Sequence, residues 1–230
     1  MRHFAAFGSL VAPIMVVVLA TACGAPHGNH DQRQPEPKPL SHTVTATVFW
    51  VGETAAADNA YIPNNASAWD GQWQAHYGGV DTPGDRQFGG KWPAGFTPKE
   101  NPFYAALPYK EFDENGRVRP NARNIPWYSA ANPPRGGYSI LKNHWIKVTY
   151  GNRVAYTQWE DVGPMNIDDA SYVFGTAAPK FALSGIDLSP ATAHYLGVDG
   201  KAVVSWQFVD NGEVPSGPWK EIVTTRQISP

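Results

Sequence analysis

The chain is nearly free of cysteine, because Cys23 is its one cysteine in 230 residues. A disulfide needs two cysteines, so no bridge can form within the chain, and the folded part has to be stabilised by its hydrophobic core. This excludes a small disulfide-rich secreted scaffold. Residues 43–230 are numerous enough to build a single substantial core.

Excess charge of one sign is also lacking, since the formal net charge is -2. Such a balance disfavours nucleic acid as a partner. A glycine-rich phosphate loop and a Gly-x-Ser-x-Gly nucleophile elbow are both absent from the sequence. His144 and His194 have no Cys or His at ligand spacing, and the 166–169 stretch lacks the closing Glu of a calcium loop. We therefore expect no cofactor and no metal.

Long apolar runs are absent except at the N-terminus. Residues 1–22 combine a basic start, an apolar run and a small-residue end, which predicts a secretory signal peptide. A spanning helix is disfavoured because Gly8 and Pro13 interrupt the short run. Cys23 predicts a bacterial lipoprotein signal, with this cysteine acylated (palmitate) as a membrane anchor; an ordinary signal peptide with an incidental cysteine is the alternative. Residues 23–42, rich in Pro, Gln, Asn and His, then predict a flexible linker.

Residues 43–230 predict a single, mainly β domain. The 22 glycines and 21 prolines of the chain separate many short segments, and no long helical period is present. In Thr43–Trp50 apolar residues alternate with threonines, which predicts a first strand. Asn101–Phe112 predicts another.

Residues 146–159 predict a β-hairpin closed by a two-residue Gly-Asn turn. Pairing Tyr150 with Arg153 across this turn sets the register of the whole hairpin. In that register Trp159 and Asp161 share the face that carries Ile146 and Val148. Asp161 is therefore expected at a strand end, on the face that lines the core.

The remaining C-terminal elements are short. Gly163-Pro164 ends the hairpin strand, because proline cannot donate to a ladder. Ser189 is the expected N-cap of a helix that continues from Pro190 and stops at Gly197. Residues 203–209 alternate apolar and polar side chains and predict the last strand.

Two motifs in this order, Asp161-Val-Gly-Pro164 and Ile186-Asp-Leu-Ser189 followed by a helix, resemble the double-psi β-barrel group of rare lipoprotein A, expansins and family 45 glycoside hydrolases. The resemblance covers the C-terminal third of the chain well, and upstream only Phe103–Pro108 looks like its counterpart. It implies a six-stranded double-psi β-barrel with short helices and long, aromatic-rich loop insertions.

The resemblance also assigns two candidate catalytic residues. Asp187 matches the general acid of family 45 hydrolases and the catalytic Asp of membrane-bound lytic transglycosylase A, and Asp161 matches the acid of the Asp-x-Gly-Pro motif. Inverting hydrolysis needs two carboxyl groups about 6.5–9.5 Å apart, whereas a lytic transglycosylase can use one acid because the muramyl 6-hydroxyl replaces water. The lytic relatives carry a His where this chain has Ala105-Ala106, so their mechanism does not transfer directly.

Both acids also have structural readings. Asp187 could cap the helix that follows it, and Asp161 could hold the Gly-Pro turn. Expansins keep such acids without showing hydrolysis, so the barrel alone does not establish catalysis.

Candidate substrate-binding residues come mainly from the long connection between Gly52 and Thr97. Its rings are spaced among polar residues and could stack on sugar faces, or could instead pack the loop onto the barrel. Asp81 follows two glycines and could fold over the barrel mouth. The candidates are Trp69, Trp73, Trp92 and Asp81 from this connection, with Trp159 and Tyr104 from the expected strands.

Together these features predict an exported, lipid-anchored, monomeric protein of the bacterial cell envelope that binds a glycan, peptidoglycan rather than cellulose. Three readings stay open: a lytic transglycosylase or glycosidase, an expansin-like binder without bond cleavage, and a structural lipoprotein that docks a protein partner. The membrane enters as a partner through the lipid anchor, and nucleic acid does not.

Overall fold

The structure is a computed structural model that describes residues 40–165 and 168–228. The expected signal peptide (1–22), the acylated Cys23 and nearly all of the expected linker (23–42) lie outside the described residues. The described residues belong to one compact unit. No helix within them has the length and apolar character that crossing a bilayer requires.

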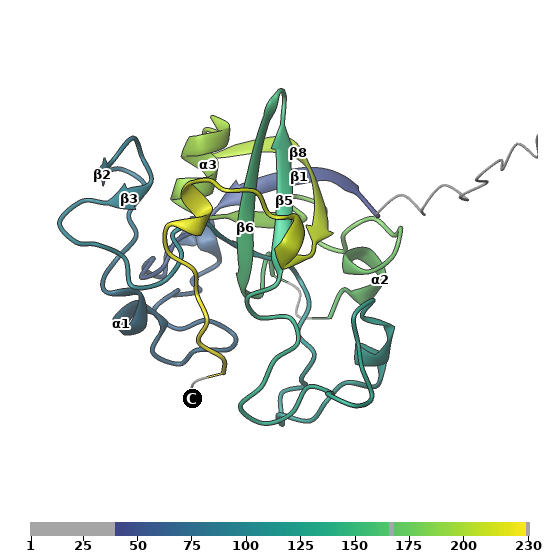
Figure 1. Cartoon of the computed structure of the whole chain (residues 1–230). Coiled ribbons are helices and arrows are strands. Elements are labelled where there is room, and N and C mark those ends of the chain that lie inside the picture. The colour runs from purple at the N-terminus through teal and green to yellow at the C-terminus, as the bar shows by residue number, and fades with distance from the viewer. Residues whose placement is uncertain (1–39, 166–167, 229–230) are drawn as a thin grey trace, which may run out of the picture. The chain divides into compact units, whose positions relative to one another are not determined.

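Six strands close into a barrel in the order β1-β7-β4-β6-β5-β8 (Figure 1). The β1–β7 and β4–β6 pairs are parallel, and the other neighbours are antiparallel. The mainly β, closed six-stranded architecture expected from the sequence is therefore confirmed. Its strands are β1 (His42–Val48), β4 (Tyr104–Ala106), β5 (Trp145–Tyr150), β6 (Arg153–Asp161), β7 (Ile186–Leu188) and β8 (Lys201–Val209).

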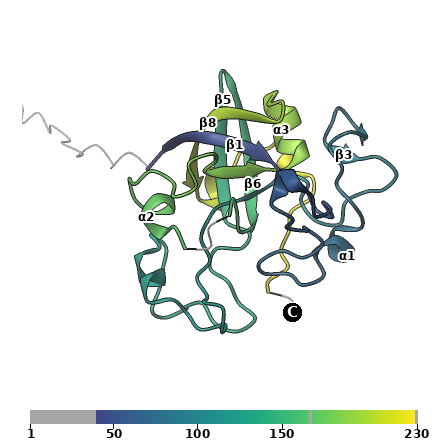
Figure 2. The same cartoon turned by 180° about the vertical axis from the view of Figure 1, so that it is seen from behind.

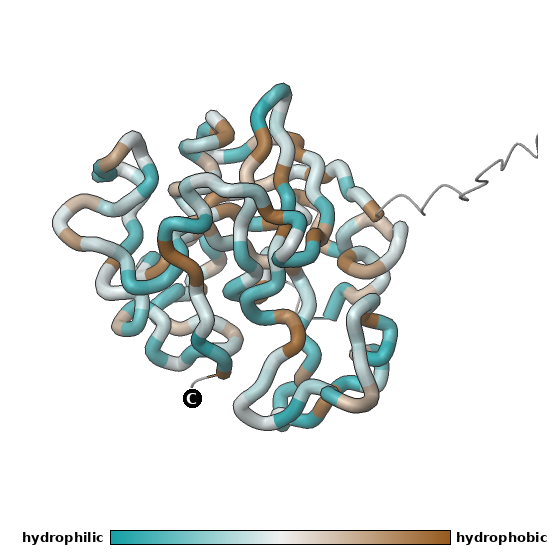
Figure 3. The backbone as a smooth tube through the Cα atoms, viewed as in Figure 1, coloured by the Kyte–Doolittle hydropathy of each residue, from teal (hydrophilic) through white to brown (hydrophobic). Residues whose placement is uncertain are grey.

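The β5–β6 hairpin has the register that its turn predicts, with Tyr150 opposite Arg153 and Val148 opposite Ala155. Both hydrophobic and hydrophilic residues occur along the hairpin (Figure 3). Trp159 is fully buried on the inner face, as that register requires. Gln158 and Glu160 on the outer face of β6 are buried as well: Gln158 donates to the Thr224 carbonyl of the C-terminal segment, residues 214–228, and Glu160 pairs with Lys142.

Two expected strands are shorter than predicted. The strand expected over Asn101–Phe112 is limited to β4, Tyr104–Ala106, and the first strand ends at Val48 rather than Trp50. Asn101 instead uses its side chain to donate to Gln158 Oε1 on β6 and to the Trp219 carbonyl of the C-terminal segment. These side-chain bonds replace the ladder that a longer strand would have made.

Long loops flank the barrel on two sides. Residues 52–100, with α1 and the small β2–β3 sheet, lie on one side, and residues 110–140 lie on the other, near α2 (Figures 1 and 2). Among the described residues three short α-helices are present. The elements outside the barrel are β2 (Arg86–Gln87), β3 (Trp92–Pro93), α1 (Trp73–Tyr77), α2 (Ala170–Val173), α3 (Pro190–Leu196) and 3-10 turns at Ala57–Asn59, Pro120–Asn124, Asn211–Glu213 and Pro218–Lys220.

The hydrophobic core has two parts. The larger fills the barrel and continues under the loops, with Trp159, Trp206 and Leu188 among its fully buried members. The smaller packs α1 against β4 through Phe49, Trp73, Tyr77 and Tyr104, among others. Its rings meet edge-on, with centroids 5.3 Å apart between Trp73 and Tyr104.

Candidate functional site

The two candidate acids lie on either side of one residue of β4. Ala106 pairs with Asp161 of β6 on one side and with Asp187 of β7 on the other. Neighbouring strands are about 4.8 Å apart, so the two aspartate backbones are separated by roughly 10 Å. Residues that are distant in the sequence therefore meet at one end of the barrel, as the resemblance implies.

Asp187 lines a cleft with a volume of about 760 Å³. We call this the Asp187 cleft; its walls include Trp50, Glu53 and Phe181. The side chain is half-buried, and Thr47 of β1, its register partner, donates a hydroxyl hydrogen bond to Oδ1. Burial raises the pKa of Asp187 to about 6, and the Glu53 carboxylate adds to the rise. The hydrogen bond from Thr47 acts in the opposite direction and lowers the pKa. A carboxyl group in such a setting can hold and donate a proton near neutral pH.

Gly163 connects the two motifs. A Cβ atom at this position would lie 2.8 Å from Asp187 Oδ2 and 3.4 Å from the Ala106 Cβ. Glycine is therefore what lets the Asp187 carboxyl group approach the backbone of the Asp-x-Gly-Pro loop. Packing at the site therefore requires glycine at position 163 of the Asp-x-Gly-Pro motif, beside Asp187.

Asp161 is in a different environment, because its side chain is nearly enclosed, with 8% of its surface exposed. Its Oδ1 accepts hydrogen bonds from the backbone N–H groups of Ala68, at 2.7 Å, and Val162, at 2.8 Å. Burial raises the pKa of Asp161 to about 7, and the charge of Asp187 contributes to the rise, while both N–H groups oppose it. Asp161 does not line the Asp187 cleft.

The structural readings of the two acids have opposite outcomes. Asp187 does not cap the following helix, because Ser189 is the N-cap and accepts from the Thr192 N–H at 3.2 Å. Asp161 does hold its own turn through Val162, and it also fixes the 52–100 loop through Ala68.

Most of the proposed stacking rings are core residues. Trp69, Trp73, Trp159 and Tyr104 expose 2% or less of their surface. The Trp69 indole donates to Glu111 Oε2 at 3.1 Å and meets Trp159 edge-on, with ring centroids 5.9 Å apart. A ring enclosed in this way has no free face for a sugar, so the prediction that these four bind substrate is wrong. The alternative, in which the loop packs onto the barrel, is what the structure shows.

Asp81 is also buried and does not reach the barrel mouth. It accepts from the Arg86 guanidinium at 2.7 Å and from the Tyr104 hydroxyl at 2.8 Å. Arg86 in turn donates to the backbone carbonyls of Gly90 and Lys91, which ties the β2–β3 sheet to the smaller core. The substrate-binding prediction for Asp81 is therefore wrong, and its role is structural.

Trp92 is half-buried, unlike the other predicted rings, and packs edge-on against the exposed Phe88 at 4.7 Å between centroids. It lies on β3 and does not line the Asp187 cleft. The structure instead places Thr47, Trp50 and Glu53 there, which sequence reasoning missed. Their position beside Asp187 depends on the pairing of β1 with β7, a contact between residues 140 positions apart in the sequence.

The described residues contain no group of three or more His, Cys, Asp or Glu side chains arranged to hold a metal ion. Asp168, from the stretch considered for a cation, accepts hydrogen bonds from Arg119 and Asn121 instead.

Comparison with known proteins gives no family. No family model matches the chain, and no curated protein does. Among solved structures, the Streptomyces papain inhibitor (SPI) is similar over 74% of this chain and 96% of its own length, with 15% identity and a TM-score of 0.32.

Proposed function

We propose that this protein binds a glycan strand of the bacterial cell envelope in the Asp187 cleft and cleaves it with Asp187 as general acid. The observation that carries the proposal is the position of a carboxyl group with a pKa of about 6 in the wall of a cleft of about 760 Å³. The half-buried rings of Trp50 and Phe181 border the same cleft and offer apolar surface to a sugar.

Of the three acids that line the cleft, Asp187, Glu53 and Asp199, we assign the chemistry to Asp187 alone, by the route that needs no activated water. Protonated Asp187 donates its proton to the glycosidic oxygen as the bond from that oxygen to C1 breaks. The ionised carboxylate then accepts the proton of the muramyl 6-hydroxyl, while the oxygen of that hydroxyl forms the new bond to C1. The product is a 1,6-anhydro sugar, and the acid is regenerated.

Asp161 acts as a positioning residue in this proposal. Its two backbone bonds hold Ala68 and the loop that contains Gly163, against which the Asp187 carboxyl group rests. Hydrolysis with inversion would need a second carboxylate facing the same space. Asp161 lies outside the cleft lining, and Glu53, which is part of it, is buried and accepts a hydrogen bond from the Asn64 side chain at 2.8 Å. We therefore favour a one-acid mechanism over a two-acid one.

The setting of this activity is part of the proposal. We infer a double-psi β-barrel related to the rare lipoprotein A group, exported as a monomer and anchored to the envelope through an acylated Cys23. The anchor places the barrel beside peptidoglycan, which is why peptidoglycan is preferred over cellulose as the polymer. The muramyl 6-hydroxyl required by the one-acid route exists only in the former.

The test is digestion of purified sacculi by residues 38–230, followed by mass analysis of the released fragments. Release of 1,6-anhydro fragments is expected from the native sequence and from Asp161→Asn, and none is expected from Asp187→Asn. Because the acid must be protonated, kcat/KM is expected to fall about tenfold per pH unit above pH 6. Fragment release that survives Asp187→Asn would contradict the assignment of the acid.

An expansin-like binder is the second candidate, and one observation favours it. The strand position that carries a His in the lytic relatives is the buried Ala105-Ala106 of β4, so a partner for the acid is missing from that strand. Sedimentation with sacculi and with cellulose separates the cases. Co-sedimentation without any fragment release supports the binder, and a lack of co-sedimentation with both polymers leaves only a structural role.

A further inference from the structure

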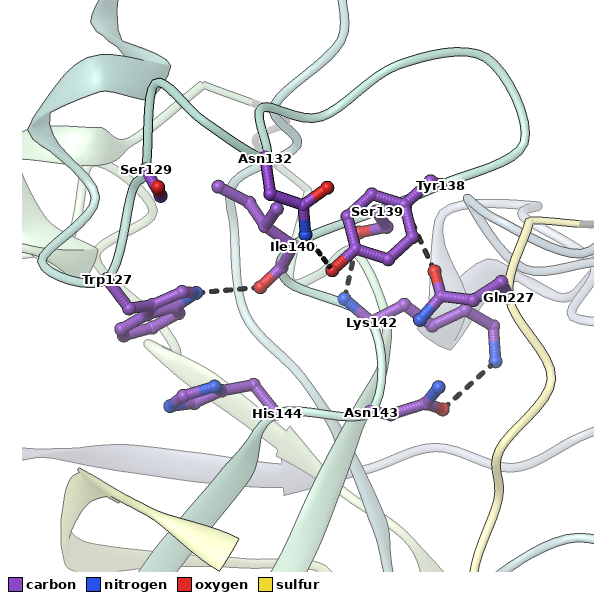
Figure 4. Close-up of a pocket in the computed structure, with 10 residues that line it drawn as sticks. All are labelled: Trp127, Ser129, Asn132, Tyr138, Ser139, Ile140, Lys142, Asn143, His144 and Gln227. Carbon is purple, nitrogen blue, oxygen red and sulfur yellow. Dashed lines mark hydrogen bonds between the residues drawn. The ribbon is translucent and has the colours of Figure 1, made fainter.

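A second pocket, with a volume of about 240 Å³, lies away from the Asp187 cleft and shares no lining residue with it. We call it the amide pocket (Figure 4). The loop before β5 forms most of it, and Gln227 of the C-terminal segment closes one side. Ile140 is the one aliphatic residue in its lining, which is Trp127, Ser129, Asn132, Tyr138, Ser139, Ile140, Lys142, Asn143, His144 and Gln227.

The aromatic wall of the amide pocket is fixed in place. The Trp127 indole N–H donates to the Ile140 carbonyl at 2.7 Å, and the His144 ring stacks on Trp127 with centroids 3.7 Å apart and planes 4° apart. Asn132 donates to the Tyr138 hydroxyl at 3.0 Å, which holds the opposite rim. A ligand would therefore meet a preorganised wall and would not have to order it.

No residue that lines the pocket offers a free charge to a ligand; the nearby Arg135 guanidinium lies over the Tyr138 ring, 4.6 Å from its centroid, outside the lining. The Lys142 ammonium is bound to Glu160 Oε2 at 2.6 Å, with both side chains nearly or completely buried. Burial lowers the pKa of His144 to about 4, so its ring is neutral at physiological pH. An ion would find no counter-ion among the lining residues, whereas a neutral polar ligand avoids the cost of burying a charge.

Several hydrogen-bonding groups in the pocket remain available. Gln227 uses Oε1 to accept from the Ser139 N–H at 2.9 Å, and its amide hydrogens have no acceptor among the described residues. The Tyr138 hydroxyl accepts from Asn132 and still has its own hydrogen to donate. The His144 ring nitrogens likewise make no hydrogen bond within residues 40–165 and 168–228, which leaves one donor and one acceptor.

The amide pocket also has a neighbour. A pocket of about 420 Å³ shares Asn143 and His144 with it and continues along the C-terminal segment past Asn211 and Thr225. Two adjoining polar pockets suit an extended ligand with repeated hydroxyl or amide groups better than a single small molecule.

We propose that the amide pocket binds one sugar unit of a neutral, N-acetylated glycan, as a second contact with the strand that is separate from the Asp187 cleft. The identity of the polymer rests on the proposed function, while the class of ligand rests on the uncharged amide, hydroxyl and imidazole lining. A second contact would raise the residence time on the polymer, because two linked weak sites give a larger affinity than either alone.

The test uses residues 38–230 labelled with ¹⁵N and titrated with tri-N-acetylchitotriose, a soluble trimer of N-acetylglucosamine. The Trp127 indole N–H and the Gln227 side-chain amide are local NMR probes for the amide pocket, and the Trp50 indole N–H is the probe for the Asp187 cleft. We expect both amide-pocket probes to shift with one dissociation constant. Gln227→Ala should weaken that constant about fivefold, the loss expected for one hydrogen bond.

Two further variants complete the design. Ser129→Trp, at the exposed rim, should fill the pocket and abolish the Trp127 response while the rest of the spectrum stays native. Asn115→Ala, on an exposed turn, is the matched control and should bind like the native sequence.

The outcomes separate this inference from the proposed function. A shift of the Trp50 probe alone would overturn the amide-pocket inference and leave the proposed function standing. A shift at Trp127 without fragment release from sacculi would support the inference while the cleavage proposal fails. An unchanged Trp127 signal at millimolar trimer would overturn the inference. Binding of the trimer by Gln227→Ala and by Ser129→Trp as tightly as by the native sequence would overturn it as well.

Discussion

Asp161→Asn should make the domain more stable at neutral pH. The native carboxyl group has a pKa of about 7 because burial disfavours its ionised form. In the unfolded chain its pKa returns to the ordinary value of 3.8. Between these two values the folded state holds a proton that the unfolded state has lost, so the free energy of unfolding falls as the pH rises.

The magnitude follows from the gap between 3.8 and about 7. At 1.36 kcal/mol per pH unit this corresponds to roughly 4 kcal/mol as an upper bound, all of it lost by about pH 8. Asparagine removes the titration. Both backbone bonds to Asp161 end on Oδ1, from Ala68 and Val162, so the amide oxygen of asparagine can keep both.

Urea denaturation of residues 38–230 at pH 5, 6, 7 and 8 would measure the effect. The native sequence should lose stability across this range, with Asp187 and Glu160 contributing in the same direction because burial raises their pKa values too. Asp161→Asn should show a smaller slope and a higher free energy of unfolding at pH 8. Asp85→Asn, which changes an exposed carboxylate, should keep the native slope. A less stable Asp161→Asn variant at pH 8 would refute the reasoning.

Two further substitutions test the packing. Gly163→Ala should lower the free energy of unfolding by about 1–3 kcal/mol and lower any activity of Asp187, because the new Cβ would lie 2.8 Å from the Asp187 Oδ2. Gly212→Ala, with open space around it, is the control. Equal denaturation midpoints for the two variants would contradict the close approach. Asn101→Ala should cost roughly 2–3 kcal/mol, because it leaves buried polar groups of β6 and the C-terminal segment unpaired. Limited proteolysis should then cut the C-terminal segment faster, and a cleavage rate like that of Asn115→Ala would argue against this role.

The parts of the fold that sequence reasoning predicted well are those decided by neighbouring residues. The Gly-Asn turn sets the β5–β6 register, because Tyr150 and Arg153, which pair across it, are only three positions apart in the sequence. Helix α3 begins after Ser189 and stops at Gly197, both of which act on the residues next to them. The burial of Trp159 follows from the same register, and a buried ring has no free face on which a sugar could stack.

The parts that failed depend on contacts between distant residues. Trp69 lies in a connection without periodicity, and its burial depends on Glu111, which accepts its indole N–H, and on Asp161, which holds the adjacent Ala68. The opposite face of β6 is buried because Asn101 and the C-terminal segment cover Gln158. Such partners leave no local pattern in the sequence, so the burial of Trp69 could not be predicted and a stacking ring was a natural expectation.

The pairing of β1 also constrains how the molecule is made. Its hydrogen-bonding partners are β7 and β8, so the first strand of the barrel to be synthesised has to wait for residues 186–209 before it finds both neighbours. Until then its ladder groups on both edges stay open to other chains. The barrel cannot close until β8 has been synthesised, and pairings across such sequence separations form slowly. A period of vulnerability to aggregation during synthesis is therefore built into the order of the strands.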